Sequence, residues 1–285
     1  MHWQTSRHRI ALDQPRVMGI VNVTPDSFSD GGRFFAGTQA ALAQCEKLIA
    51  EGAAILEIGG ESSRPGSPPV PLAEELARVL PVLREAVRLG VPVSVDTYKP
   101  EVMRQVLDLG ADIINDIWGL QQPGAVEAVA AHPLCGVCLM HMHGEPGTMQ
   151  RNPMEGDAVP QVRRFLRERS DVLRQRGVAA DRIVWDPGIG FGKTVEQNFA
   201  LLARQGELLQ DGYPLLAGWS RKSSLGTVTG EPVDQRAAAS VAAALLAVEH
   251  GARIVRVHDV RETVAALKVW TMTRQAGPAP AEQAT

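Results

Sequence analysis

Short apolar segments recur along the chain, and several of them lack the alternation of apolar and polar residues that marks a half-exposed strand. Such runs of Val, Ile and Leu are typical of strands covered on both faces, as in a parallel sheet. The sequence predicts eight strands, at 17–23, 53–60, 91–96, 112–117, 136–142, 182–188, 214–220 and 253–259.

Helical segments separate these runs. Residues 38–51 have Thr38 as the expected N-cap and end before Gly52. Residues 72–89 contain Pro81, which predicts a kink or a break. The remaining predicted helices cover 100–109, 124–131, 158–176, 195–209, 234–250 and 260–274.

Eight strands and eight helices in strict alternation predict an α/β fold of one domain, the (β/α)8 or TIM barrel. Consecutive βαβ units are right-handed, and eight of them can close into a barrel. An open doubly wound sheet is the alternative, but no glycine-rich dinucleotide motif follows the first predicted strand. We expect the barrel domain to cover residues 1–275, with the segment before residue 16 capping its bottom and a disordered tail at 276–285.

The composition indicates a globular protein and argues against some partners. Of 285 residues, 45% are hydrophobic and 21% are charged, and the net charge is −3. This charge provides no field that would recruit nucleic acid or anionic lipid, so we expect neither as a partner. An anionic ligand must therefore be held by local groups.

The chain has no sequence signal for export or for membrane insertion. No apolar stretch approaches the length needed to span a bilayer, and the first ten residues, MHWQTSRHRI, lack the apolar core of a secretory signal. With three cysteines and no export signal, we expect a cytoplasmic protein.

Two short motifs suggest redox or metal chemistry, and we interpret both conservatively. Cys135 and Cys138 form a C-x-x-C, but this motif lies in an apolar run, so buried thiols are the preferred interpretation. His141 and His143 do not predict zinc, because no third soft ligand accompanies them.

Polar or glycine-rich residues follow every predicted strand. In a barrel the carboxyl ends of the strands share one mouth, where catalytic residues lie. A single polar residue at a strand end is usually a helix cap, but eight such clusters at one mouth are hard to explain as caps. The candidates are Asn22, Ser63, Arg64, Asp96, Asn115, Met140, Asp186, Phe191, Ser220, Lys222, Arg256 and His258.

Several of these candidates suit an anionic ligand. The hydroxyl and cationic donors fit a phosphate or diphosphate, and they are Ser63, Arg64, Lys222, Arg256 and His258. Asn22 offers an amide oxygen, a suitable ligand for Mg²⁺ that also binds phosphate oxygens. Two glycine-rich segments, 31–37 and 59–66, are expected to form loops that close over the mouth.

The other candidates suit a flat heterocycle. Asp96, Asn115 and Asp186 are short acceptors or mixed donor/acceptors at strand ends, and they can read the N–H edge of such a ring. Phe191 and Met140 can form apolar walls for it, although residues of these types are more often part of a core.

Taken together, these segments resemble the dihydropteroate synthases of folate biosynthesis. The matching motifs are MGIVNVTPDSFSDGG, GGESSRPG, VDTYKPEV, INDI, LMHMHGEP, DPGIGFGK, SRKS and RVHDV, which span residues 18–260 in the order of the family. The resemblance implies a β/α barrel, usually a homodimer and a target of sulfonamides. It also implies a transferase that condenses 4-aminobenzoate with (7,8-dihydropterin-6-yl)methyl diphosphate, with Mg²⁺, to give dihydropteroate and pyrophosphate.

The resemblance also implies residue roles. The pterin should be held by Asp96, Asn115, Asp186 and Lys222, and the diphosphate by Ser63, Arg256 and His258. Asn22 should bind Mg²⁺, and the aminobenzoate pocket should be bordered by Ser220, Lys222, Phe191, Pro65 and Arg64. Of these, Asp96, Asp186 and Lys222 are the expected catalytic residues.

Five positions depart from the usual pattern of the family. Ser63 stands where Thr is common, and Glu57 and Tyr98 stand where Asp and Ser are frequent. Trp118 and Trp219 replace other residue types. None of these changes removes a group assigned to chemistry, but bulky Tyr98 and Trp219 are expected near the mouth, where they would alter the pocket shape and the sulfonamide response.

Two other functions are compatible with the same barrel. A pterin-binding methyltransferase would not need the SRKS motif, the diphosphate donors or the TPDSFSDGG segment, all of which are present. A non-catalytic pterin-binding paralogue predicts loss of Asp186, Lys222 or Arg256, and all three are present. The synthase is therefore the preferred interpretation.

Overall fold

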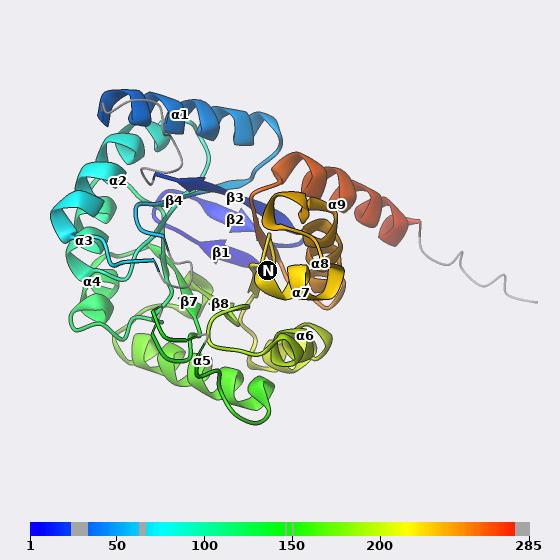
Figure 1. Cartoon of the computed structure of the whole chain (residues 1–285). Coiled ribbons are helices and arrows are strands. Elements are labelled where there is room, and N and C mark those ends of the chain that lie inside the picture. Colours follow the sequence, from blue (N-terminus) through cyan, green and yellow to red (C-terminus); the bar gives the residue numbers. More distant parts are fainter. Residues whose placement is uncertain (24–33, 63–66, 146, 150, 277–285) are drawn as a thin grey trace, which may run out of the picture.

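Eight parallel strands form the sheet of a β/α barrel, as the strand pattern predicts (Figure 1). The computed structural model describes residues 1–23, 34–62, 67–145, 147–149 and 151–276. The strands are β3 (Arg16–Asn22), β4 (Ile55–Gly59), β5 (Val93–Asp96), β6 (Ile113–Asp116), β7 (Gly136–Met140), β8 (Ile183–Asp186), β9 (Leu216–Ala217) and β10 (Ile254–Val257). Their hydrogen-bonded order is β8-β7-β6-β5-β4-β3-β10-β9. A single parallel bridge between Trp185 and Leu215 joins β8 to the start of β9, so the barrel is nearly closed.

Helices surround the sheet, and at least one helix follows each strand along the chain (Figure 1). They are α1 (Phe34–Ala50), α2 (Leu72–Ala86), α3 (Pro100–Asp108), α4 (Ala125–Ala131), α5 (Ala158–Gln175), α6 (Val195–Ala203), α7 (Ser223–Thr229), α8 (Ala237–Glu249) and α9 (Val260–Gln275). All eight predicted helical segments are helical in the structure. The short helix α7, directly after β9, was not predicted.

Three helix predictions were wrong in detail. The helix α1 begins at Phe34, so Thr38 lies inside it and is not its N-cap. Of the kink or break predicted at Pro81, the break does not occur, because α2 continues to Ala86. A proline removes one backbone hydrogen bond, while the helix keeps its buried face through Val79 and Val82.

The third error concerns the segment 195–209. It divides into α6 and a 3₁₀ segment, Gln205–Asp211. The side chain of Gln205 turns inward there and donates to the carbonyl of Ala247 at 2.9 Å, which favours a tighter turn over continued α-helix.

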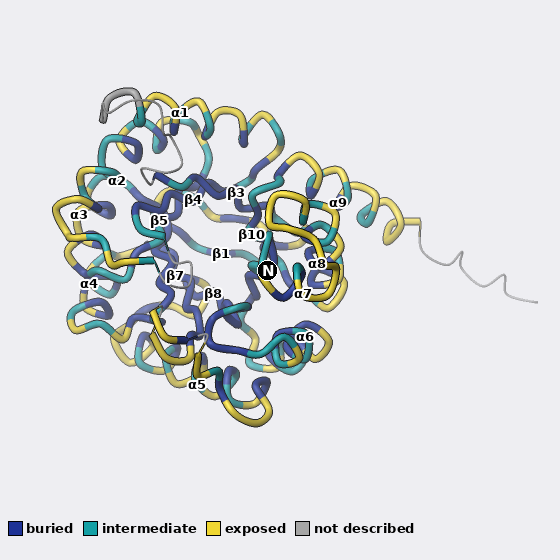
Figure 2. Tube along the Cα trace, in the orientation of Figure 1, coloured by how far each residue is buried: buried dark blue, intermediate teal, exposed yellow. Residues whose placement is uncertain are grey.

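The strands are buried on both faces, whereas the helices expose their outer sides (Figure 2). Every residue of β4, β7 and β8 is buried. This explains why their sequences lack alternation. Cys45, Cys135 and Cys138 are buried free thiols, which confirms the conservative interpretation of the C-x-x-C motif.

A hairpin at the N-terminus closes the bottom of the barrel, as expected. Its strands are β1 (His2–Gln4) and β2 (Arg9–Ala11). Trp3 is fully buried in a cluster with residues from the first halves of the barrel strands, such as Met18 and Ile55. In the described part of the chain, no helix has both the length and the apolar character needed to cross a membrane. The predicted tail lies outside the described residues from position 277 onward.

Candidate active site

Neighbouring strands bring polar side chains to one level at the carboxyl end of the sheet. Asn22, Gly59, Asp96 and Asn115 are paired in sequence across β3, β4, β5 and β6. Gly59 has no side chain to separate its neighbours: a Cβ there would lie 3.7 Å from the Asp96 Cβ and 3.8 Å from the Asn22 Oδ1. The predicted metal ligand and one of the predicted pterin acceptors therefore lie side by side.

Arg256 reaches this level from β10 and pairs with two carboxylates. Its Nη2 lies 3.2 Å from the Asp96 Oδ2, and its Nε donates to the Glu57 Oε2. Glu57 is fully buried and also accepts a hydrogen bond of 2.7 Å from the Asn115 Nδ2. Three predicted site residues thus meet around Glu57.

Glu57 was not among the predicted site residues, although it contacts two of them. The alternation of side-chain direction along a strand could have identified Glu57 from the sequence. In the segment ILEIG, Glu57 lies two positions before Gly59 and therefore faces the same side of the strand. A charged residue on the inner face of an otherwise apolar strand needs a partner, which Arg256 provides.

The charges of this cluster shift one another's proton affinities. Burial, reinforced by the negative charge of Glu57, raises the pKa of Asp96 to about 8, although Arg256 opposes the shift. Burial opposes the charge of Arg256, but the attraction of Glu57 and Asp96 outweighs it and raises the pKa of the guanidinium. Perturbed pKa values of this kind are typical of functional sites.

A second group of predicted residues lies at the ends of β8 and β9. Asp186 is buried and accepts a hydrogen bond of 2.7 Å from the Gly188 N–H. Burial raises the pKa of Asp186, while this hydrogen bond and the charge of Lys222 oppose the increase. Burial, together with the positive charge of Arg256, lowers the pKa of Lys222 to about 8.

Phe191 and Met140 are the two residues that the sequence offered either as apolar walls or as part of a core. The Lys222 Nζ lies 4.2 Å from the centre of the Phe191 ring, so this ring borders the charged site. Phe191 and Met140 also belong to a buried apolar cluster with Ile117. Phe191 is therefore part of the core and also borders the charged site, whereas Met140 is shown only as part of the core.

Ser220 and His258 form a pair between the ends of β9 and β10. The Ser220 Oγ lies 3.0 Å from the His258 Nδ1 and accepts a hydrogen bond of 3.1 Å from the His258 backbone N–H. The hydroxyl thereby limits the orientation of the imidazole ring.

Lys193 is a second residue that the sequence analysis did not assign. It is buried, and its Nζ donates to the carbonyl oxygens of His141, Gly188 and Phe191 at 3.2, 2.8 and 3.1 Å. It ties the segment after β7 to the loop after β8. Its position at the end of the motif DPGIGFGK is the sequence feature that could have identified it.

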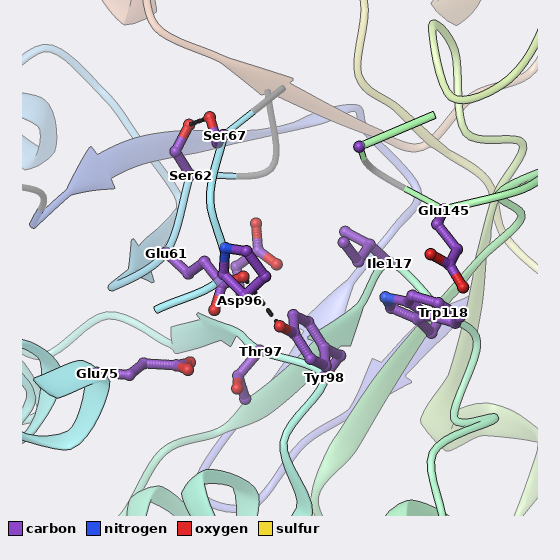
Figure 3. Close-up of a pocket in the computed structure, with 12 residues that line it drawn as sticks. Glu61, Ser62, Ser67, Glu75, Asp96, Thr97, Tyr98, Ile117, Trp118 and Glu145 are labelled. Carbon is purple, nitrogen blue, oxygen red and sulfur yellow. Dashed lines mark hydrogen bonds between the residues drawn. The ribbon is translucent and has the colours of Figure 1, made fainter. Parts of the chain in front are cut away.

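A cavity of about 340 Å³ opens at the mouth on the side of β4, β5 and β6 (Figure 3). Its walls include Asp96, Tyr98 and Trp118, and the rings of Tyr98 and Trp118 have centroids 6.2 Å apart. Tyr98 also donates a hydrogen bond of 2.9 Å to the Glu61 Oε1 (Figure 3). Tyr98 therefore lines the mouth as expected, together with Trp118.

Trp219 does not follow that expectation. It is only 2% exposed and its ring packs against Phe199 of α6, with centroids 5.2 Å apart. The placement of Trp219 at the mouth was therefore wrong, since its side chain lies in the core between the sheet and the helices. The predicted site residues Ser63 and Arg64, and Pro65 with them, lie outside the described residues.

Comparisons with known proteins identify the family of the chain. Residues 18–258 match the family model described as pterin binding enzyme. The chain is 52% identical over 273 residues to a dihydropteroate synthase from Neisseria meningitidis serogroup B, covering 94% of this chain and 96% of that protein.

Two solved structures are similar over nearly the whole chain. One is a dihydropteroate synthase from Burkholderia cenocepacia in complex with 7,8-dihydropteroate, with a TM-score of 0.88 and 53% identity, covering 96% of this chain and 97% of that chain. The other is a Xanthomonas albilineans dihydropteroate synthase with 4-aminobenzoic acid, with a TM-score of 0.91 and 49% identity, covering 98% and 100%.

Proposed function

The chain belongs to the pterin-binding enzymes and, among them, to the dihydropteroate synthases, and from this we propose how its own residues perform the reaction. The reaction joins 4-aminobenzoate to the methylene carbon of (7,8-dihydropterin-6-yl)methyl diphosphate and releases pyrophosphate and 7,8-dihydropteroate. One observation carries the proposal for the site. The Arg256 Nη2, a donor for an anion, lies 3.2 Å from the Asp96 Oδ2, an acceptor for the heterocycle.

The pterin half of the substrate binds between the two groups of buried acceptors. Asp96 and Asn115 accept from its N–H groups on one side. On the other side Asp186 accepts from N–H groups of the ring, and Lys222 donates to an acceptor atom of the ring. The Asn115 Oδ1 is buried and has no hydrogen-bond partner among the described residues, as expected for an atom that awaits a donor from a ligand. Phe191 supplies an apolar wall.

The diphosphate half binds at the basic side of the mouth. Arg256 lies in β10, and His258 follows the last residue of this strand. Ser63, which lies outside the described residues, is the third donor that the family pattern assigns to the diphosphate. A guanidinium suits phosphate oxygens because its planar N–H donors match their geometry.

Mg²⁺ would be held by Asn22 together with the diphosphate oxygens. The donors fit such an ion: the Asn22 amide oxygen faces the mouth beside Gly59, and Mg²⁺ commonly takes one or two protein ligands plus substrate phosphates and water. When bound, the ion neutralises charge that develops on the departing pyrophosphate.

The residues of the chain lower the barrier chiefly by electrostatics. As the carbon–oxygen bond to the diphosphate breaks, positive charge develops on the pterin methylene, and the carboxylates of Asp96 and Asp186 stabilise it. Arg256 and His258 stabilise the negative charge of the leaving group. The neutral aromatic amine of 4-aminobenzoate then attacks the methylene and loses one proton to solvent, so a strong base is not required.

A pyrophosphate-release assay tests this function. The purified protein is incubated with the pterin diphosphate and Mg²⁺, with and without 4-aminobenzoate. We expect release that depends on the amine, that stops when the ion is removed by a chelator and that returns when Mg²⁺ is added. Absence of amine-dependent release would reject the function, and activity unchanged after chelation would reject the metal.

We further propose that the protein is a cytoplasmic homodimer. Five of the eight exposed large apolar side chains in the described residues lie on or between α7, α8 and α9, and they are Val228, Val233, Leu246, Val269 and Met272. Exposed apolar groups gathered on neighbouring helices favour an interface with a second copy. Light scattering should give twice the mass of the 30.7 kDa chain, and Leu246→Glu should shift it toward the monomer. The free thiols of all three cysteines suit a reducing compartment.

A further inference from the structure

Glu57 lies between the two halves of the proposed substrate site, where it contacts residues of both. It lies in the middle of β4 and is fully buried. Its Oε1 accepts from the Asn115 Nδ2 at 2.7 Å and from the Ser94 Oγ at 3.4 Å, and its Oε2 accepts from the Arg256 Nε. Both oxygens of this carboxylate are therefore occupied by donors from other strands.

These contacts determine which way the amide of Asn115 points. A carboxylate can only accept hydrogen bonds, so the NH₂ group of Asn115 must face Glu57. The carbonyl oxygen of the amide must then point away from Glu57. This Oδ1 is the buried atom without a hydrogen-bond partner among the described residues. Glu57 thus selects the acceptor end of Asn115 for the ligand.

The same carboxylate anchors the guanidinium of Arg256. The side chain of Arg256 is 20% exposed, whereas that of Glu57 is not exposed at all. The guanidinium is planar, so it has little freedom to rotate once its Nε is bound to a buried carboxylate. Its Nη2 is directed at Asp96 for this reason.

We propose that Glu57 is a positioning residue that presents the Asn115 carbonyl oxygen to the pterin and holds the Arg256 guanidinium beside Asp96. Glu57 acts through these two residues and does not contact the substrate itself. The inference rests on the proposed function of the site, because it assumes that Asn115 receives a donor from the pterin ring.

The substitution Glu57→Gln tests the orientation of Asn115 directly. The Gln oxygen remains the acceptor for the Arg256 Nε, so its NH₂ group faces Asn115, which must rotate to accept from it. The site then presents a donor to the pterin N–H groups. We expect the dissociation constant of a pterin without a diphosphate, 6-hydroxymethylpterin, to rise at least about tenfold in calorimetric titration. The dissociation constant of inorganic pyrophosphate should change less than about threefold, because the Arg256 contact is kept.

Glu57→Asp is the conservative variant. It keeps a group that only accepts hydrogen bonds, so Asn115 keeps its orientation, and most of the pterin affinity lost in Glu57→Gln should return. A residue with a purely structural role would not distinguish these two variants by ligand affinity. Circular dichroism and thermal unfolding of each variant show that the titrated protein is folded.

Asp112 provides a matched control at the opposite end of the barrel. Its carboxylate is also fully buried and also binds an arginine, with a distance of 2.5 Å to the Arg7 Nη2. Asp112→Asn should lower the unfolding temperature and leave the affinity for 6-hydroxymethylpterin unchanged.

A double substitution shows whether Glu57 acts through Asn115. In an Asn115→Ala background, adding Glu57→Gln should not weaken pterin binding further, because the group that Glu57 orients is gone. The inference is overturned if Glu57→Gln binds 6-hydroxymethylpterin like the wild type, if Glu57→Asp binds it as weakly as Glu57→Gln, or if the two effects add. These results are distinct from a failure of the proposed function, which the pyrophosphate-release assay of the wild-type protein reports.

Discussion

At the scale of single residues, the properties of the site come from charges that the barrel holds at close range. Asp96 lies near the negative Glu57 and 3.2 Å from the positive Arg256. The balance of burial and these two charges leaves the pKa of Asp96 at about 8. A carboxyl group with such a pKa gains its negative charge as pH rises through about 8.

The substitution Asp96→Asn separates the chemical role of this carboxyl group from its effect on stability. Without a carboxylate to stabilise the cationic methylene, we expect turnover to fall by about 100-fold or more. The folded-state pKa of about 8 exceeds the ordinary value of 3.8, so the folded protein keeps a proton that the unfolded chain has lost between these pH values. The contribution of Asp96 to stability therefore decreases as pH rises from about 4 to 8.

Asparagine does not titrate, so the unfolding temperature of the variant relative to the wild type should increase over that pH range. Calorimetric unfolding at several pH values measures this difference. An Asn variant with nearly normal turnover would remove Asp96 from the chemical step. A temperature difference that is independent of pH would contradict the raised pKa.

We expect Lys222 to set the alkaline limit of activity. Burial and Arg256 lower its pKa to about 8, so this residue loses its positive charge as pH rises through 8. We expect kcat/KM to decrease above this pH, because the neutral amine is a weaker partner for the pterin and for Asp186. Arginine stays charged at all relevant pH values, so Lys222→Arg should remove the alkaline decrease even if its maximum rate is lower. A pH profile of kcat/KM for both proteins is the measurement, and an unchanged alkaline limb in Lys222→Arg would exclude Lys222 as its source.

At the scale of elements, the loop after β8 is shaped by glycines that permit close approach to β7. Gly188 has a positive φ of 68°, and a Cβ at this position would lie 1.8 Å from the carbonyl oxygen of His141. The same loop carries Phe191, and the bond from the Lys193 Nζ to the His141 carbonyl oxygen ties it to the segment after β7. The position of the apolar wall therefore depends on this contact between backbones.

Gly188→Ala should displace the loop. The backbone would have to move to accommodate the methyl group, so we expect a loss of more than about 3 kcal/mol in the free energy of unfolding. Gly177 is the matched control, since it has a φ of 84° and no atom within 4 Å of the position of an added Cβ. Gly177→Ala should cost only about 1 kcal/mol. Denaturant unfolding compares the two variants, and equal losses would show that the contact with His141 does not matter.

The sequence predicted the presence of strands and helices better than the residues at which they begin and end. All eight strands were found because buried parallel strands have continuous apolar runs, a property of the local sequence. The start of α1 at Phe34 was missed because Thr38 is a favourable cap and nothing in the local sequence ranks it below an earlier start. The helix α7 was missed because its residues, SSLGTVT, have weak helical propensity.

The site was predicted less completely, because part of it depends on pairs of residues that are distant in the sequence. Asn22, Asp96, Asn115 and Asp186 were identified as strand-end residues, and Asp96 and Asn115 are indeed paired neighbours. The partnership of Glu57 with Arg256 joins residues 199 positions apart. No local pattern shows such a pair, and only closure of the sheet between β3 and β10 brings them together.

At the scale of the whole molecule, the barrel separates a stabilising end from a reactive end. Trp3 fills the bottom, where it is fully buried, and its Nε1 donates a hydrogen bond of 2.9 Å to the carbonyl of Arg182. Gly136, the first residue of β7, makes room for the indole, since a Cβ there would lie 3.0 Å from the Trp3 Nε1. The residues assigned to the reaction lie at the other ends of the same strands, so loss of the indole should weaken the fold without altering the chemistry.

Trp3→Ala removes the largest side chain of this plug and leaves a cavity, so we expect a loss of about 3–5 kcal/mol in the free energy of unfolding. Trp3→Phe keeps an aromatic ring but leaves the Arg182 carbonyl without its donor, and we expect a smaller loss of about 1–3 kcal/mol. In both variants kcat and KM of the folded protein should equal those of the wild type at temperatures well below unfolding. Chemical denaturation combined with steady-state kinetics tests both parts. A change in KM for the pterin diphosphate would show that the two ends of the barrel are coupled, because packing at the bottom would then reach Asp96 and Asn115 through β5 and β6.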